Sequence, residues 1–70
     1  MNIGEAVEHI RGGGKACRSG WNGKNMHIFR VLGGPGRPDY VMMSTAQGDW
    51  IPWTCSQSDL LAEDWELLDP

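Results

Sequence analysis

The chain has few cysteines, no long apolar run and no excess of basic residues, and each shortage argues against a class of protein. Two cysteines are too few for the disulfide framework of a small secreted domain. No apolar run approaches the roughly 20 residues that span a bilayer. The net charge of -3 disfavours an extended nucleic acid partner. Because the chain starts at Met1 without a targeting segment, the sequence predicts a cytoplasmic protein with no membrane association.

The motifs of nucleophilic, metal and phosphate-loop chemistry are missing as well. Cys17, Cys55, His9 and His27 stand singly, without the paired spacing of a zinc site. No base and third group accompany either thiol, so both cysteines are interpreted as small buried residues. The glycines before Lys15 follow a predicted helix instead of preceding one, which is the wrong order for a phosphate loop. The sequence therefore predicts neither catalysis nor a metal or cofactor site.

What is present begins with a helix at the N-terminus. Asn2 and Glu5 have the spacing of a capping box, and the glycines from residue 12 to 14 end the helix. The apolar residues between these signals recur on one helical face, at Ile3, Ala6, Val7 and Ile10. This face must cover another element of the fold.

Strands follow the helix. Residues 15–18, 26–32, 40–46 and 50–53 show the alternation or β-branched and aromatic content of strands. Pro52 makes the last of these short or places it at an edge. Ser56 can cap a single helical turn, after which residues 65–68 could close the sheet. The prediction is one α+β domain over residues 1–70, with the N-terminal helix packed on a small antiparallel sheet of about four strands.

Small size favours self-association. A chain of 70 residues buries only about 60% of the surface that it exposes when unfolded, so its core alone gives marginal stability. Four tryptophans and four methionines can form an apolar self-association surface, and a Trp-rich monomeric core is the alternative. The sheet face opposite the helix is free to meet a copy of the same chain, and we expect a homo-oligomer.

One turn concentrates chemically distinct groups. Trp21 offers a ring for packing or stacking, Asn22 offers donors and an acceptor, and Lys24 offers a positive charge. Gly20 and Gly23 give the backbone access to positive φ angles. These groups suit a phosphorylated heterocycle, and they equally suit a well-packed turn, so the local pattern leaves both interpretations open.

A second polar cluster lies near the C-terminus. Trp53 precedes it, and Asp59 could either cap a helix or hydrogen bond to a ligand. Glu63 and Asp64 are interpreted as a solvated acidic end. Among the remaining aromatic residues, Trp65 is predicted to lie in the core. A core position is also the simplest interpretation of Trp50.

Three segments together resemble a known family. They are residues 2–6 (NIGEA), residues 18–26 (RSGWNGKNM) and residues 53–65 (WTCSQSDLLAEDW). In this combination they are similar to the small phage family that includes the second type of Thoeris anti-defence protein. One departure is the short segment at residues 33–39, where many relatives carry a longer insertion.

The resemblance implies a non-enzymatic sponge. Such proteins bind a cyclic nucleotide immune signal, chiefly glyco-cyclic ADP-ribose made by a bacterial TIR-domain enzyme, in the host cytoplasm. They resemble tetramers, built as dimers of dimers, whose pockets lie between protomers. The matching positions make ligand-binding candidates of Trp21, Asn22, Gly23, Lys24, Gln57 and Asp59, and Trp53 joins them through its aromatic context. The alternative is a protein-interaction module that inhibits a bacterial defence enzyme directly, with exposed aromatic residues as its contacts.

Overall fold

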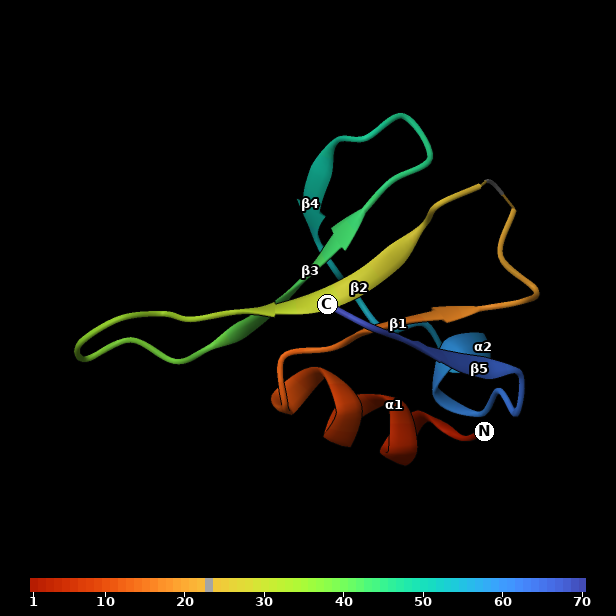
Figure 1. The fold of residues 1–70 in the computed structure, drawn as a ribbon, viewed down its shortest axis with the longest axis horizontal. Coiled ribbons are helices and arrows are strands. Elements are labelled where there is room, and N and C mark those ends of the chain that lie inside the picture. Colours follow the sequence, from red (N-terminus) through yellow and green to blue (C-terminus); the bar gives the residue numbers. More distant parts are fainter. Residues whose placement is uncertain (23) are drawn as a thin grey trace.

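Five antiparallel strands form one open sheet in the computed structural model, which describes residues 1–22 and 24–70 (Figure 1). The strand order is β4-β3-β2-β1-β5. The strands are β1 (Lys15–Arg18), β2 (His27–Val31), β3 (Tyr40–Ser44), β4 (Trp50–Pro52) and β5 (Trp65–Leu68). The prediction of about four strands was one too few, because β5 pairs with β1 along its whole length. Of the predicted ligand residues, Gly23 lies outside the described part of the chain.

The N-terminal helix α1 (Ile3–Arg11) begins and ends as the sequence predicts. The side chain of Asn2 accepts from the backbone N–H of Glu5, and the Glu5 carboxylate accepts from the backbone N–H of Asn2. The capping box is thereby confirmed. Gly14, just past the helix, lies so close to the His9 ring that a side chain there would collide with it. That contact brings α1 tightly against the start of β1.

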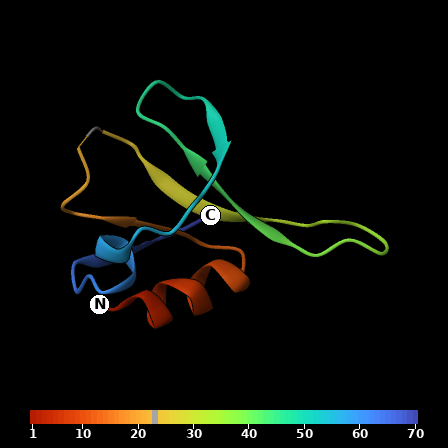
Figure 2. The same ribbon diagram turned by 180° about the vertical axis from the view of Figure 1, so that it is seen from behind.

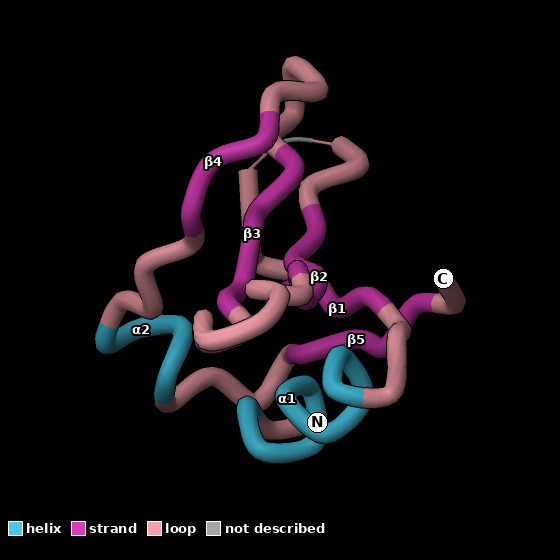
Figure 3. Tube along the Cα trace, turned by 90° about the vertical axis from the view of Figure 1, so that its left-hand side faces the viewer, coloured by secondary structure: helices cyan, strands magenta, loops and turns pink. Residues whose placement is uncertain are grey.

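The core lies between α1 and one face of the sheet. It consists of Ala6 and Ile10 from the helix and Ala16, Ile28 and Trp65 from three strands. Figure 3 shows α1 directly below β5 and α2 to the left of it, while β4 and most of β3 extend upward, away from both helices. The helical layer therefore covers only part of the sheet.

The second helix, α2 (Gln57–Leu60), contacts the core through the backbone carbonyl of Asp59, which accepts the indole N–H of Trp65. After β4 the chain runs back across the sheet to reach α2 (Figure 2). Ser56 caps the helix, because its hydroxyl accepts the backbone N–H of Asp59 at 3.1 Å. This confirms the cap predicted from the sequence. No helix in the described residues is long and apolar enough to cross a membrane.

The opposite sheet face carries an apolar surface that no described helix covers. Side-chain alternation and the β2–β3 and β3–β4 registers place its residues together, and the rings of Phe29 and Trp50 meet edge to face at 5.1 Å. We call this surface the uncovered face and define it as Phe29, Val31, Tyr40, Met42 and Trp50. Trp50 is 67% exposed, so its interpretation as a core residue was wrong.

Candidate functional site

Two of the predicted ligand residues flank the largest core side chain. Trp65 is 2% exposed. Trp21 meets it edge to face with 5.4 Å between ring centroids, and Trp53 does so at 6.1 Å from the chain that follows β4. Three distant parts of the sequence thus converge on one aromatic cluster. Such edge-to-face pairs stabilise beyond the area that they bury.

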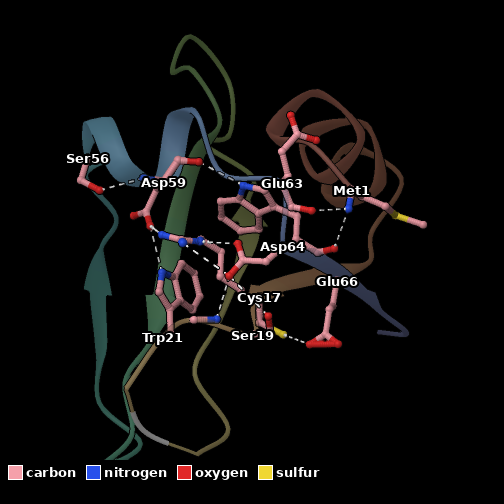
Figure 4. A network of polar contacts seen from close by, with 12 residues as sticks. Met1, Cys17, Ser19, Trp21, Ser56, Asp59, Glu63, Asp64 and Glu66 are labelled. Atoms are coloured by element: carbon pink, nitrogen blue, oxygen red, sulfur yellow. Dashed lines mark hydrogen bonds and ion pairs between the residues drawn. The ribbon is translucent and has the colours of Figure 1, made fainter.

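Asp59 fixes the ring of Trp21 (Figure 4). Its Oδ1 atom accepts the indole N–H of Trp21 at 2.9 Å and a guanidinium N–H of Arg18 at 2.8 Å. Its backbone carbonyl accepts the indole N–H of Trp65 at 3.1 Å. The side chain of Asp59 is therefore not the helix cap, which Ser56 supplies, but the acceptor that joins the turn to α2.

Asp64 holds the backbone of the same turn. Its carboxylate accepts Arg18 Nε at 2.7 Å, the backbone N–H of Gly20 at 2.8 Å and the hydroxyl of Ser19 at 3.3 Å. The interpretation of Glu63 and Asp64 as a solvated acidic end was therefore wrong for Asp64, which is half-buried and paired. It holds for the exposed Glu63.

These contacts shift the pKa of both carboxyl groups downward. Burial alone would raise the pKa of Asp59, but hydrogen bonds from Trp21, Arg18 and Ser56 together outweigh it and lower that pKa. The hydrogen bond from Arg18 is the main reason that the pKa of Asp64 is lowered, and the N–H of Gly20 adds to it. Both aspartates are thus ionised at neutral pH.

The shifts predict an acid-sensitive stability. An unfolded aspartate takes up its proton near pH 3.9, whereas folded Asp59 and Asp64 do so only at lower pH. The unfolded state then binds more protons, so the free energy of unfolding should hold steady near neutrality and decrease below about pH 5. Urea unfolding at a series of pH values measures this decrease. Asp64→Asn should make the decrease with falling pH shallower. Glu63→Gln, which removes the neighbouring exposed charge, is the control. Equal dependence of the unfolding free energy on pH in both variants and the wild type would contradict the role assigned to Asp64.

A hollow of about 450 Å³ opens beside the turn. That volume lies within the range of small-ligand pockets. Trp21 is half-buried, and it lines the hollow together with Lys15, Cys17, Met26, His27 and Leu68. Arg18 and Asp69 line it too, so the hollow combines an aromatic ring, apolar side chains, two cations, an imidazole and a carboxylate. The sequence analysis missed Lys15 and His27, although the alternation of β1 already places Lys15 and Cys17 on one face.

The remaining predicted site residues lie at the surface. Asn22 and Lys24 are exposed within the turn, and Gln57 is the exposed first residue of α2. The structure thus joins Trp21, Trp53 and Asp59 through contacts and leaves Asn22, Lys24 and Gln57 at the surface. Among the described residues, no group of three or more histidine, cysteine and acidic side chains is arranged to hold a metal ion.

The two thiols differ in environment. Cys17 is half-buried, and its thiol lies 3.9 Å from the carboxylate of Glu66. Burial and the negative charge of Glu66 raise the pKa of Cys17. Cys55 is exposed, so its interpretation as a buried residue was wrong.

Comparison with known proteins shows the family of this chain. The profile of the Tad2-like family, described as the Thoeris anti-defense 2-like domain, matches residues 1–68. Thoeris anti-defense 2 of Bacillus phage SP01 is 33% identical over 84 aligned positions, which cover 97% of this chain and 94% of the relative. The aligned length exceeds the 70 residues of this chain, so the relative carries residues without a counterpart here. The chain belongs to the Thoeris anti-defense 2-like family of phage anti-defence proteins.

Proposed function

We propose that the protein binds a cyclic nucleotide immune signal and holds it without chemical change, which blocks the anti-phage defence that the signal activates. The ligand is glyco-cyclic ADP-ribose or a related cyclic oligonucleotide. The observation that carries the proposal is the ring of Trp21, which is fixed by Asp59 and lines a hollow of nucleotide size. Membership of the anti-defence family supports the same role.

The chemistry of the hollow suits a phosphorylated heterocycle. Trp21 can stack on a base, and Lys15 from β1 supplies a cation for a phosphate group. Asn22 and Lys24 are exposed in the same turn, and in this proposal they add an amide and a cation to the contact with the ligand. Nanomolar binding requires about 12 kcal/mol, more than phosphate attraction gives in salt water, so stacking must contribute.

Holding the ligand intact requires that no group attack it. The thiol of Cys17 is one of the groups that line the hollow. Because burial and Glu66 raise the pKa of Cys17, this thiol stays protonated at neutral pH, and a protonated thiol is a weak nucleophile. This environment supports sequestration over catalysis.

We propose that the protein works as a homo-oligomer, a tetramer built as a dimer of dimers. The uncovered face supplies apolar surface for the contact. Both sheet edges are poorly suited to pairing with another strand, because Pro52 lacks an N–H in β4 and Trp65, at the start of β5, already bonds to Met1. Association through the sheet face is therefore favoured over extension of the sheet.

Calorimetry and native mass spectrometry test these proposals. Titration with glyco-cyclic ADP-ribose should give tight binding, and heating the complex should release the ligand unaltered. Linear ADP-ribose is the matched control and should bind more weakly. Native spectra should show four subunits with retained ligand. Lack of binding or release of an altered product would refute sequestration, and a monomer would refute the assembly.

The alternative function, direct inhibition of a defence enzyme, is favoured by a single feature. The exposed ring of Trp50 beside Phe29 resembles the aromatic anchors of protein interfaces. If Trp50→Ser abolished anti-defence activity in cells while ligand binding and subunit count stayed normal, this alternative would replace the sponge.

A further inference from the structure

Arg18 connects two segments that lie far apart in the sequence. One guanidinium group binds Asp59, 41 residues away, and Asp64, 46 residues away. Each carboxylate in turn holds a different part of the turn: Asp59 binds the indole N–H of Trp21, and Asp64 binds the backbone N–H of Gly20. The guanidinium group of Arg18 thus holds both the Trp21 ring and the Gly20 backbone, each through one carboxylate.

The geometry of arginine is needed for this arrangement. Nη1 donates to Asp59 at 2.8 Å, while Nε donates to Asp64 at 2.7 Å and Nη2 contacts the same carboxylate at 3.4 Å. A planar fork with several donors reaches both acceptors at once, whereas the ammonium group of lysine is a single point charge. The side chain of Arg18 is 19% exposed, so solvent competes weakly for these bonds.

Charge balance gives Arg18 a second task. Asp59 and Asp64 lie close to a site proposed to receive an anionic ligand, and two free carboxylates there would repel phosphate groups. Arg18 compensates part of this negative charge and directs both carboxylates toward the protein. The indole N–H of Trp21 is also occupied by Asp59, which leaves only the ring surface of Trp21 for a ligand.

We propose that Arg18 is a positioning residue: through Asp59 and Asp64 it orients the ring of Trp21, so that the site recognises a heterocycle by stacking and not through the indole N–H. The part of this inference that concerns ligand recognition rests on the proposed function. The part that concerns the orientation of the Trp21 ring does not depend on any ligand. In this proposal Asp59 supports the ring of Trp21 instead of contacting the ligand as the sequence had predicted.

The test compares Arg18→Lys with the wild type by NMR and calorimetry. The Trp21 indole N–H signal, assigned by its loss in Trp21→Phe, should shift and exchange with solvent about tenfold faster, because its acceptor is no longer held. The indole signal of Trp50, which lies on the uncovered face and packs against Phe29, should stay in place. Affinity for glyco-cyclic ADP-ribose should fall about tenfold, since a charge-assisted network orients the ring.

Two further variants separate positioning from a general structural role. Arg30→Lys alters a more exposed pair with Asp39, whose charged atoms are 3.6 Å apart, and should change neither readout. Asp64→Asn removes one partner of Arg18 but keeps an acceptor for Gly20, so it should show the same changes as Arg18→Lys to a smaller extent. Asp64→Asn also provides the test if Arg18→Lys fails to fold.

Each outcome decides the inference. An unshifted Trp21 signal in both Arg18→Lys and Asp64→Asn would overturn it, as would displacement of all four indole signals together. If the wild type binds no cyclic nucleotide, the proposed function fails, while the NMR comparison still decides whether Arg18 orients Trp21. If the Trp21 signal shifts and affinity is unchanged, stacking by Trp21 is refuted as the mode of recognition.

Discussion

Trp65→Ala is expected to remove a large part of the free energy of unfolding of the domain. Trp65 is buried, packs against Trp21 and Trp53, and donates its indole N–H to the carbonyl of Asp59. Removing a buried tryptophan costs about 3–5 kcal/mol. At about 0.05–0.15 kcal/mol per residue, a 70-residue domain has only about 4–10 kcal/mol of stability in total. The single substitution therefore removes a large part of it.

Urea unfolding followed by circular dichroism measures this loss. Trp65→Phe should be intermediate, because it retains a ring but not the N–H donor to Asp59. Leu61→Ala is the control, since Leu61 is exposed at the end of α2 and its truncation should change the stability by less than about 0.5 kcal/mol. If Trp65→Ala unfolded at the wild-type urea concentration, the aromatic cluster would not be the centre of the core.

Local signals predicted most of the elements correctly. The Asn2–Glu5 box, the cap at Ser56 and the edge position that Pro52 imposes on β4 all involve contacts or exclusions within a few residues. The β-rich run ending at Val31 became the middle strand of the sheet. Such features follow from backbone chemistry and short-range periodicity, which a sequence displays directly.

The site network could not be predicted in the same way. Arg18 meets Asp64 because β1 pairs with β5 in a register that sets Arg18 opposite Trp65. Nothing near Arg18 specifies that register, and β5 was placed only as a strand that could close the sheet. Without the β1–β5 pairing, Asp64 could not be distinguished from the solvated acidic residues around it. The site network therefore depends on long-range strand pairing, which the chemistry of the single residues does not indicate.

The exposed Trp50 shows a related limit. Tryptophan is usually interpreted as core because of its large apolar surface. Here α1 packs on β1, β2 and β5 and leaves the far side of β3 and β4 bare, so Trp50 stays exposed on the uncovered face. Which face a single helix covers depends on packing that the β4 sequence does not display. This bare face is the one that we propose to contact another copy of the chain.

Trp21→Ala is expected to have the largest effect on ligand binding. Stacking on an aromatic ring contributes about 1–3 kcal/mol per base, so removal of the ring should weaken affinity for glyco-cyclic ADP-ribose by about 5- to 150-fold. Calorimetry at pH 7 measures the affinity. Because Trp21 also packs on Trp65, circular dichroism must show that the variant remains folded before the affinities are compared.

Trp21→Phe is the matched variant that separates the two properties of the indole. It keeps an aromatic face for stacking and loses the N–H that donates to Asp59. If the ring surface carries recognition and Asp59 only orients it, Trp21→Phe should bind far more tightly than Trp21→Ala, with a modest loss relative to the wild type. Equal loss in both variants would instead show that the oriented indole itself is required. Unchanged affinity in Trp21→Ala would place the ligand elsewhere, and the turn would then be a structural element that joins β1 to β2.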